Sequence, residues 1–142
     1  MRLALAFAAA LGLAGLSSAL PVADVHAQDT ASFNNKFKVA VSRTGADLNI
    51  TIEGQTVDGG VWYVNRDYPM NLKLSAGAAT LGKAELTKDD ATFEGTEKAG
   101  KAKKAKFKTT ITGADKAKVA YKLVVCSDTS CSPPIKGEAS EP

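Results

Sequence analysis

Two cysteines are the residues whose type and spacing could support chemistry in this sequence. Cys126 and Cys131 enclose residues 127–130, which are small or polar and favour turns. Such a turn allows the chain to fold back, so that the two sulfurs meet within the Cα separation of about 4.4 to 6.8 Å that a disulfide requires. A pair held in this way can form a structural bridge or exchange with the thiols of another protein.

Two physical arguments favour exchange over a purely structural bridge. The loop between Cys126 and Cys131 is short, so its closure stabilises the fold by only about 2 kcal/mol in the chain-entropy model. An exposed disulfide over a short loop also belongs to the more oxidising, exchangeable kind, whereas structural bridges in secreted proteins typically lie below about −300 mV. A small inert bridge that pins a terminal turn is the alternative.

The small number of histidines and cysteines excludes most common catalytic and metal sites. The single histidine, His26, lies in a segment that we expect to be removed, so the mature chain has no imidazole for a Ser/His/Asp triad or a Cys/His pair. Two cysteines alone cannot complete a four-ligand zinc site. Cu(I) binding by Cys126, Cys131 and Met70 has suitable ligand softness but only two ligands near in sequence. We therefore expect no metal and no cofactor.

The N-terminal segment predicts export. Arg2 precedes an apolar run over residues 3–16, and small residues follow it. The run is shorter than the roughly 20 apolar residues of a membrane anchor. Of two candidate cleavage sites, after Ala19 and after Ala27, we prefer the second. The mature chain is then expected in the periplasm or outside the cell, without membrane insertion, where disulfides persist.

Length and composition fit one folded domain in the mature chain. The sequence has 142 residues, of which 44% are hydrophobic and 23% charged, with a net charge of +3. These values are typical of a globular domain and not of a disordered one. We expect a signal peptide over residues 1–27 and a single domain over residues 28–142, acting as a monomer.

Alternating apolar residues predict strands along the mature chain. Segments 36–41 and 47–53 each place apolar residues on one face, and the Gly-containing residues 44–47 predict a hairpin between them. The same four residue types recur at 112–115 and predict a second hairpin, between strands 104–112 and 118–125. Shorter strands are expected at 61–64, 70–74 and 84–86. Six or seven short strands without a helical period predict an all-β, immunoglobulin-like antiparallel β-sandwich.

Strand parity predicts the position of the first cysteine. Val119, Tyr121, Leu123 and Val125 share the core face, which places Cys126 on the other face, at a strand end. We therefore expect this sulfur to lie off the core and within reach of another thiol.

A lysine-rich stretch precedes the cysteines. It contains six lysines and no acid: Lys98, Lys101, Lys103, Lys104, Lys106 and Lys108. We interpret it as a solvated face with edge lysines that oppose strand-to-strand aggregation. Since it has no arginine and no interleaved aromatic residues, nucleic-acid binding is not expected.

Residues 119–134 resemble the active-site strand and turn of the amino-terminal domain of DsbD-type thiol:disulfide interchange proteins. The segment is a strand with an aromatic residue, a cysteine, an acidic turn, a second cysteine and a Pro-rich exit. The resemblance implies an immunoglobulin-like periplasmic domain whose cysteine pair accepts electrons from a membrane-embedded system and passes them to other periplasmic proteins. It also implies that Cys131 attacks and forms the mixed disulfide, and that Cys126 resolves it.

The sequence departs from this family at several positions. Four residues separate the cysteines where five are usual, and Ser132 stands where an aromatic residue is usual. The candidate for the family's cap loop is residues 62–69, in which Tyr63 or Tyr68 would shield the sulfurs; the alternative is an ordinary strand and turn with Trp62 in the core. Without the membrane and thioredoxin-like portions of a full-length reductase, the chain is expected to be a freestanding module.

Charged residues would tune the exchange. A thiolate would be stabilised by lysines such as Lys122 or Lys136, and Asp67 or Asp128 would accept a proton. The expected partners are periplasmic or membrane-bound thiol:disulfide exchange proteins. The competing hypothesis is a non-catalytic exported β-sandwich with a structural disulfide, which binds a partner through its lysine-rich surface or through residues 62–69.

Overall fold

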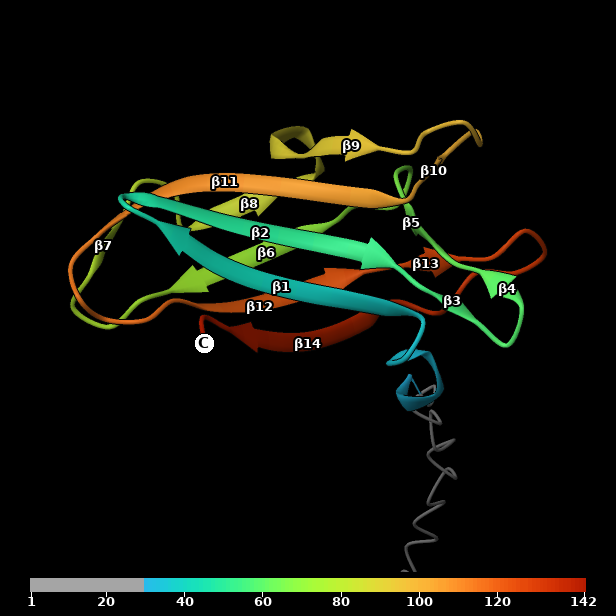
Figure 1. The fold of residues 1–142 in the computed structure, drawn as a ribbon, viewed down its shortest axis with the longest axis horizontal. Helices are drawn as coiled ribbons and strands as arrows, with labels where there is room; N and C mark the ends of the chain where they lie inside the picture. Colours follow the sequence, from blue (N-terminus) through green and yellow to red (C-terminus); the bar gives the residue numbers. More distant parts are fainter. Residues whose placement is uncertain (1–29) are drawn as a thin grey trace, which may run out of the picture.

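The computed structural model describes residues 30–142 and consists of two antiparallel layers of strands (Figure 1). The signal peptide predicted over residues 1–27 lies outside the described residues. The first layer has the order β1-β2-β11-β7, with β9 also paired to β11. Its strands are β1 (Phe37–Thr44), β2 (Asp47–Gly54), β7 (Thr80–Leu81), β9 (Thr92–Glu94) and β11 (Lys104–Thr112).

The second layer has the order β14-β12-β6-β8. Its strands are β6 (Asn71–Ser75), β8 (Glu85–Thr87), β12 (Lys118–Leu123) and β14 (Ile135–Ser140). The predicted all-β antiparallel sandwich is confirmed, and the architecture is consistent with an immunoglobulin-like fold. Within the described residues, neither short helix, η1 (Ala31–Phe33) or η2 (Lys88–Asp90), is long and apolar enough to cross a membrane.

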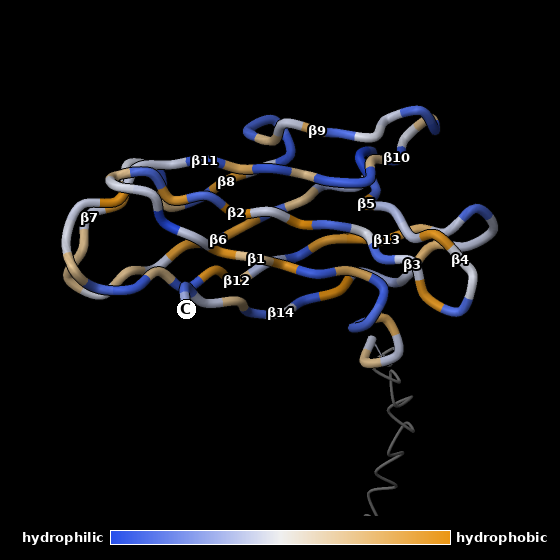
Figure 2. Tube along the Cα trace, in the orientation of Figure 1, coloured by the Kyte–Doolittle hydropathy of each residue, from blue (hydrophilic) through white to orange (hydrophobic). Residues whose placement is uncertain are grey.

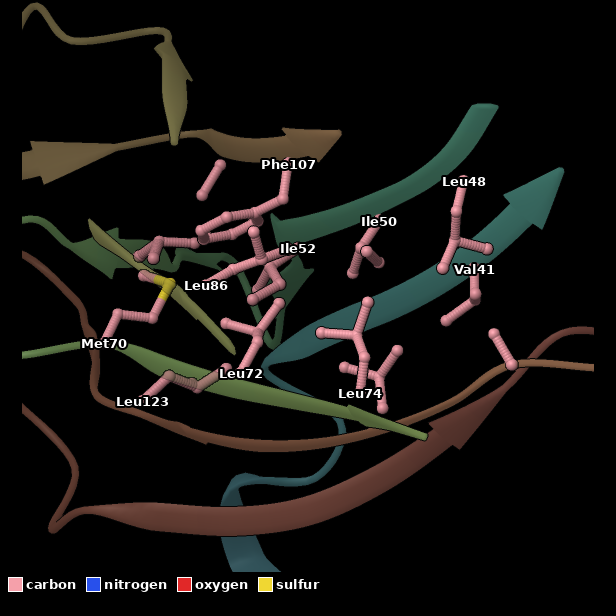
Figure 3. Close-up of a cluster of buried hydrophobic side chains, with 14 of the residues drawn as sticks. Val41, Leu48, Ile50, Ile52, Met70, Leu72, Leu74, Leu86, Phe107 and Leu123 are labelled. Atoms are coloured by element: carbon pink, nitrogen blue, oxygen red, sulfur yellow. The ribbon is translucent and has the colours of Figure 1, made fainter. Parts of the chain in front are cut away.

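The core lies between the two layers and follows from period-two alternation. Every second residue of β2 and β11 is buried, and Figure 2 shows the corresponding alternation of hydropathy along these strands. Figure 3 shows side chains from both layers meeting in one cluster, for example Ile52 and Phe107 with Leu72. Each such side chain stabilises the fold by about 1.5 to 3 kcal/mol when fully buried. The sandwich therefore has a core of its own, independent of the disulfide.

The first predicted hairpin is confirmed and the second is wrong. Thr44 lies opposite Asp47 across a turn in which Gly45 has a φ of +60°. In contrast, β11 pairs with β2, β9 and β7, whereas β12 pairs with β14 and β6. The segment after β11 thus carries the chain from one layer to the other. An alternating pattern specifies which face of a strand is buried and not which strand lies beside it.

Arg43 stabilises the segment that connects β11 to β12. Its guanidinium donates hydrogen bonds to the carbonyl oxygens of Gly113 and Asp115, both at 2.7 Å. It also pairs with Glu141 at 3.0 Å, beyond the end of β14. The pKa of Glu141 is lowered, first because the Ala117 backbone N–H donates to it and then because of Arg43. The crossover and the end of the chain are therefore held by one cation.

A small third sheet forms at one end of the sandwich. It has the order β10-β5-β13 and consists of β5 (Tyr63–Asn65), β10 (Lys101–Ala102) and β13 (Val125–Cys126). In Figure 1 it lies at the same end as the hairpin of β3 (Thr56–Val57) and β4 (Gly60–Val61). The chain leaves the second layer after Leu123 and joins this sheet at Val125. The predicted strand 118–125 is thus divided between two sheets.

A close backbone approach positions the small sheet against β2. Gly54, at the end of β2, leaves no room for a side chain, since a Cβ there would lie 2.0 Å from the carbonyl oxygen of Trp62. The Trp62 N–H in turn donates to the Gln55 carbonyl at 2.9 Å. Glycine at this position therefore allows the segment leading into β5 to pack on β2.

We expect Gly54→Ala to lower the free energy of unfolding by about 1 to 3 kcal/mol, because the backbone of Trp62 must move to admit the methyl group. Urea denaturation of the oxidised protein measures this change. Gly60→Ala is the matched control, since its Cβ would meet the Val57 carbonyl oxygen at 3.5 Å and the Trp62 Nε1 at 4.0 Å, both ordinary contact distances; it should change stability by less than about 0.5 kcal/mol. Equal effects of the two substitutions would contradict the packing argument.

Candidate functional site

Cys126 and Cys131 are joined by a disulfide, as the spacing predicted. Their Cα atoms are 4.0 Å apart, slightly closer than the common range, and the two residues also form an antiparallel bridge. The enclosed turn is ordered by Ser127, whose N–H donates to the Ser130 carbonyl at 2.8 Å and whose hydroxyl accepts from the Ser130 N–H at 3.1 Å. The loop is therefore a defined turn.

The two ends of the disulfide differ in exposure. Cys126 is only 1% exposed, whereas Cys131 is exposed. Cys126 is not part of the central hydrophobic cluster that contains Val125, but it is buried among the core residues, so the parity argument did not predict its burial. The expectation that its sulfur would be within reach of another thiol is wrong. Cys126 pairs directly opposite Tyr63 of β5 and is buried there.

Ser132 holds the strand at the point where it changes sheets. It is 6% exposed; its N–H donates to the Val125 carbonyl at 2.8 Å, and its hydroxyl accepts from the Val125 N–H at 3.1 Å. Both backbone groups of a fully buried residue are thereby satisfied. The sequence showed Ser132 only as a departure from the resembled family; a polar residue directly after a strand cysteine was the signal for its role.

Asn65 contacts the disulfide and was missed in the sequence. Its side-chain Nδ2 donates a hydrogen bond to the sulfur of Cys126 at 3.4 Å. Its Oδ1 accepts from the N–H groups of Asp67 and Tyr68, at 2.9 and 3.2 Å. An asparagine two residues before an acidic turn residue signals such a turn, but the contact with Cys126 joins residues 61 apart in the sequence.

The two candidate cap tyrosines lie in different places. Tyr63 lies opposite Cys126 in the small sheet, and its ring carries the ammonium groups of Lys98 and Lys103 at 5.2 and 5.6 Å from the centroid. The Lys103 ammonium is buried without a hydrogen-bond partner within residues 30–142 and lies over the ring face. Tyr68 lies beneath Lys122 instead, at 6.0 Å. Tyr63 is thus the candidate cap residue paired with the cysteine strand.

The charged groups at the cysteine loop differ from those expected. Asp128 pairs with Lys98, which lowers the pKa of Asp128, while Asp128 raises the pKa of Lys98. Lys101 donates to the Ser127 carbonyl at 2.7 Å. The expected lysines, Lys122 and Lys136, lie opposite each other on β12 and β14. The cations on the loop therefore come from the lysine-rich stretch.

Within residues 30–142, neither expected proton acceptor is hydrogen-bonded to a sulfur. Asp128 is engaged with Lys98, and its lowered pKa makes it a weaker base. Asp67 is exposed, and its carboxylate lies over Gly100, where a Cβ would be 2.3 Å from Oδ2. This contact brings the turn after β5 against the lysine-rich segment.

The six lysines form two groups. Lys104, Lys106 and Lys108 project from β11 toward Glu53, Glu94 and Asp47 at 3.4, 2.5 and 2.8 Å. These cross-strand pairs confirm a solvated face, although β11 is an inner strand of its sheet and not an edge. Lys98, Lys101 and Lys103 instead gather around Tyr63 and the cysteine loop.

The remaining candidates lie elsewhere. Trp62 is partly buried at the periphery of the core, edge-on to Phe33 at 5.8 Å and under Lys36 at 5.5 Å. Met70 is 2% exposed in the central cluster, to which Cys126 does not belong (Figure 3). This burial argues against the Cu(I) arrangement, and residues 30–142 contain no group of three or more His, Cys, Asp or Glu side chains placed to hold a metal.

Comparison with known proteins gives a similarity in structure alone. Neither a protein-family model nor a curated protein matches the chain. Among solved structures, the chain is similar to the DsbD N-terminal domain of Neisseria meningitidis in the reduced form. The TM-score is 0.41 and the sequence identity 13%, over 76% of this chain and 86% of that chain. At this level of similarity, the roles of individual residues rest on the contacts around the disulfide.

We expect Ser132→Ala to lower the free energy of unfolding by about 1 to 3 kcal/mol, since it leaves the buried Val125 N–H without a partner. Urea denaturation of the oxidised protein measures the loss. Ser140→Ala, at an exposed position at the end of β14, is the control and should change stability by less than about 0.5 kcal/mol. An unchanged stability in Ser132→Ala would show that the Val125 N–H is satisfied in another way.

Proposed function

We propose that this chain is an exported thiol:disulfide interchange module that relays electrons through Cys126 and Cys131 to other periplasmic proteins. The observation that carries the proposal is the asymmetry of the disulfide, which has an exposed Cys131 and a buried Cys126. Its partners would be periplasmic or membrane-bound thiol:disulfide exchange proteins. Residues 1–27 would direct export, and residues 28–142 would act as one monomeric domain.

The first half-reaction begins at the exposed sulfur. A thiolate of a reduced partner attacks Cys131, the bond between Cys131 and Cys126 breaks, and Cys126 leaves as a thiolate. The partner's second thiolate then attacks its own sulfur in the mixed disulfide and releases Cys131. The partner leaves as a disulfide, and the chain has gained two electrons as a dithiol that takes up its protons from solvent.

The second half-reaction transfers these electrons to an oxidised protein. The Cys131 thiolate attacks the substrate disulfide and forms a mixed disulfide, which Cys126 then resolves. Cys126 is held beside Cys131 by the turn of residues 127–130, so resolution is intramolecular and fast relative to attack by a second protein. Burial of Cys126 also keeps large partners away from the resolving sulfur.

Reduction should leave the domain folded. The core is independent of the disulfide, so reduction should lower the free energy of unfolding by about 2 kcal/mol while keeping a cooperative transition. Urea denaturation of oxidised and reduced protein measures this difference, and equilibration with glutathione gives the reduction potential, expected above about −300 mV. A very negative potential together with loss of the fold on reduction would support the structural disulfide instead.

Replacement of one cysteine at a time should separate the two roles. In Cys126→Ala the exposed Cys131 can form mixed disulfides that are not resolved, so covalent adducts should accumulate in an oxidising periplasm. In Cys131→Ala the remaining thiol is buried, and adducts should be about tenfold fewer. Non-reducing gels and mass spectrometry measure both. Absence of adducts with thiol:disulfide exchange proteins in Cys126→Ala would argue strongly against the relay.

A further inference from the structure

We propose that Asn65 determines which sulfur of the pair leaves. Its amide N–H stabilises negative charge on Cys126 and so directs an incoming thiolate to Cys131. This inference rests on the proposed exchange function and assigns a further residue to the same site.

The orientation of the Asn65 amide is fixed by the turn that follows it. Oδ1 accepts hydrogen bonds from the Asp67 and Tyr68 N–H groups, at 2.9 and 3.2 Å. A flip of the amide would replace this acceptor by a donor and lose both bonds. The backbone N–H of Asn65 donates to the Val124 carbonyl at 2.9 Å, directly beside the cysteine strand. The side-chain NH₂ group is therefore held toward the Cys126 sulfur, 3.4 Å away.

This hydrogen bond strengthens during the reaction. In the disulfide the sulfur is a weak acceptor. As the bond to Cys131 breaks, Cys126 acquires negative charge, and a hydrogen bond to an ionised acceptor is roughly twice as strong as a neutral one. Because the donor is already oriented, it stabilises the developing charge without reorganisation. Only interactions that are stronger in the transition state accelerate the step.

Cys126 needs such a donor because it is buried. Removal from water disfavours a thiolate and raises a thiol pKa, and a thiol of higher pKa leaves more slowly. The amide N–H opposes this effect at one of the two sulfurs. The partner thiolate then forms its new bond to Cys131, the bond between the cysteines breaks, and the electron pair goes to Cys126.

Charged side chains near the Cys126 sulfur also influence its pKa, so a test of Asn65 must leave them unchanged. Lys101 lies opposite Asn65 in β10, and Lys98 and Lys103 lie over Tyr63, the residue opposite Cys126. Asp67 and Asp128 lie on the two adjoining turns. A substitution at Asn65 leaves these groups in place; Asn65→Ala reports on the amide alone, whereas Asn65→Asp also adds a negative charge beside the sulfur.

Asn65→Asp keeps the turn, because its carboxylate can still accept the Asp67 and Tyr68 N–H groups but cannot donate to Cys126; the same measurements on Asn65→Ala show the effect without the added charge. With Cys131→Ala added, thiolate ultraviolet absorbance gives the pKa of Cys126 alone, and this pKa should rise by about one unit or more. With both cysteines present, reduction by dithiothreitol should be about tenfold slower.

Asn49→Asp adds the same charge on β2, opposite Lys108 and outside the small sheet, and should change none of these values. Asn65→Ala removes the donor without adding charge, and it replaces Asn65→Asp if that variant does not fold. An unchanged Cys126 pKa in a folded Asn65 variant would overturn the inference, even if Cys126→Ala still traps partners. If the pKa rises but Cys126→Ala traps none, the relay fails and the role of Asn65 at the sulfur stands.

Discussion

Burial of two consecutive valines is the constraint on which the geometry of the cysteine pair depends. Val124 and Val125 are 5% and 0% exposed, so the alternation of β12 cannot continue through them. The ladder to β6 and β14 ends at this point, and Val125 pairs with Val64 of β5 instead. Since Val125 belongs to the core cluster, strand alternation places Cys126 on the opposite side of the small sheet, where Asn65 contacts its sulfur.

The same change of sheet explains why two polar residues are buried or half-buried here. A strand that leaves its neighbours loses ladder hydrogen bonds, and a buried unpaired N–H is costly. Ser132 satisfies Val125, and the backbone of Asn65 satisfies the Val124 carbonyl. Asn65 then has its side chain beside the sulfur as a consequence of the backbone pairing. The fold and the proposed chemistry thus share the same contacts.

Lysines that are close in the lysine-rich stretch make different contacts in the fold. Along β11 alternate lysines reach acids on adjacent strands, and such exposed pairs contribute little individually. The lysines before β11 instead meet Tyr63, Asp128 and the Ser127 carbonyl. Composition alone predicts a basic face. Because β10 pairs with β5, the lysines around β10 lie against the cysteine loop instead.

The sequence by itself determined the features that depend on near neighbours. Period-two alternation identified the buried faces of β1, β2, β11 and β12, a glycine marked the first hairpin, and a spacing of five predicted the disulfide. Only the tertiary structure decided that β11 pairs with β2, that Ile135–Ser140 adds a strand after two prolines, and that Cys126 is buried while Cys131 is exposed. The reason is physical: alternation encodes a face but not a neighbour, and the contact of Asn65 with Cys126 joins residues 61 apart that only packing brings together.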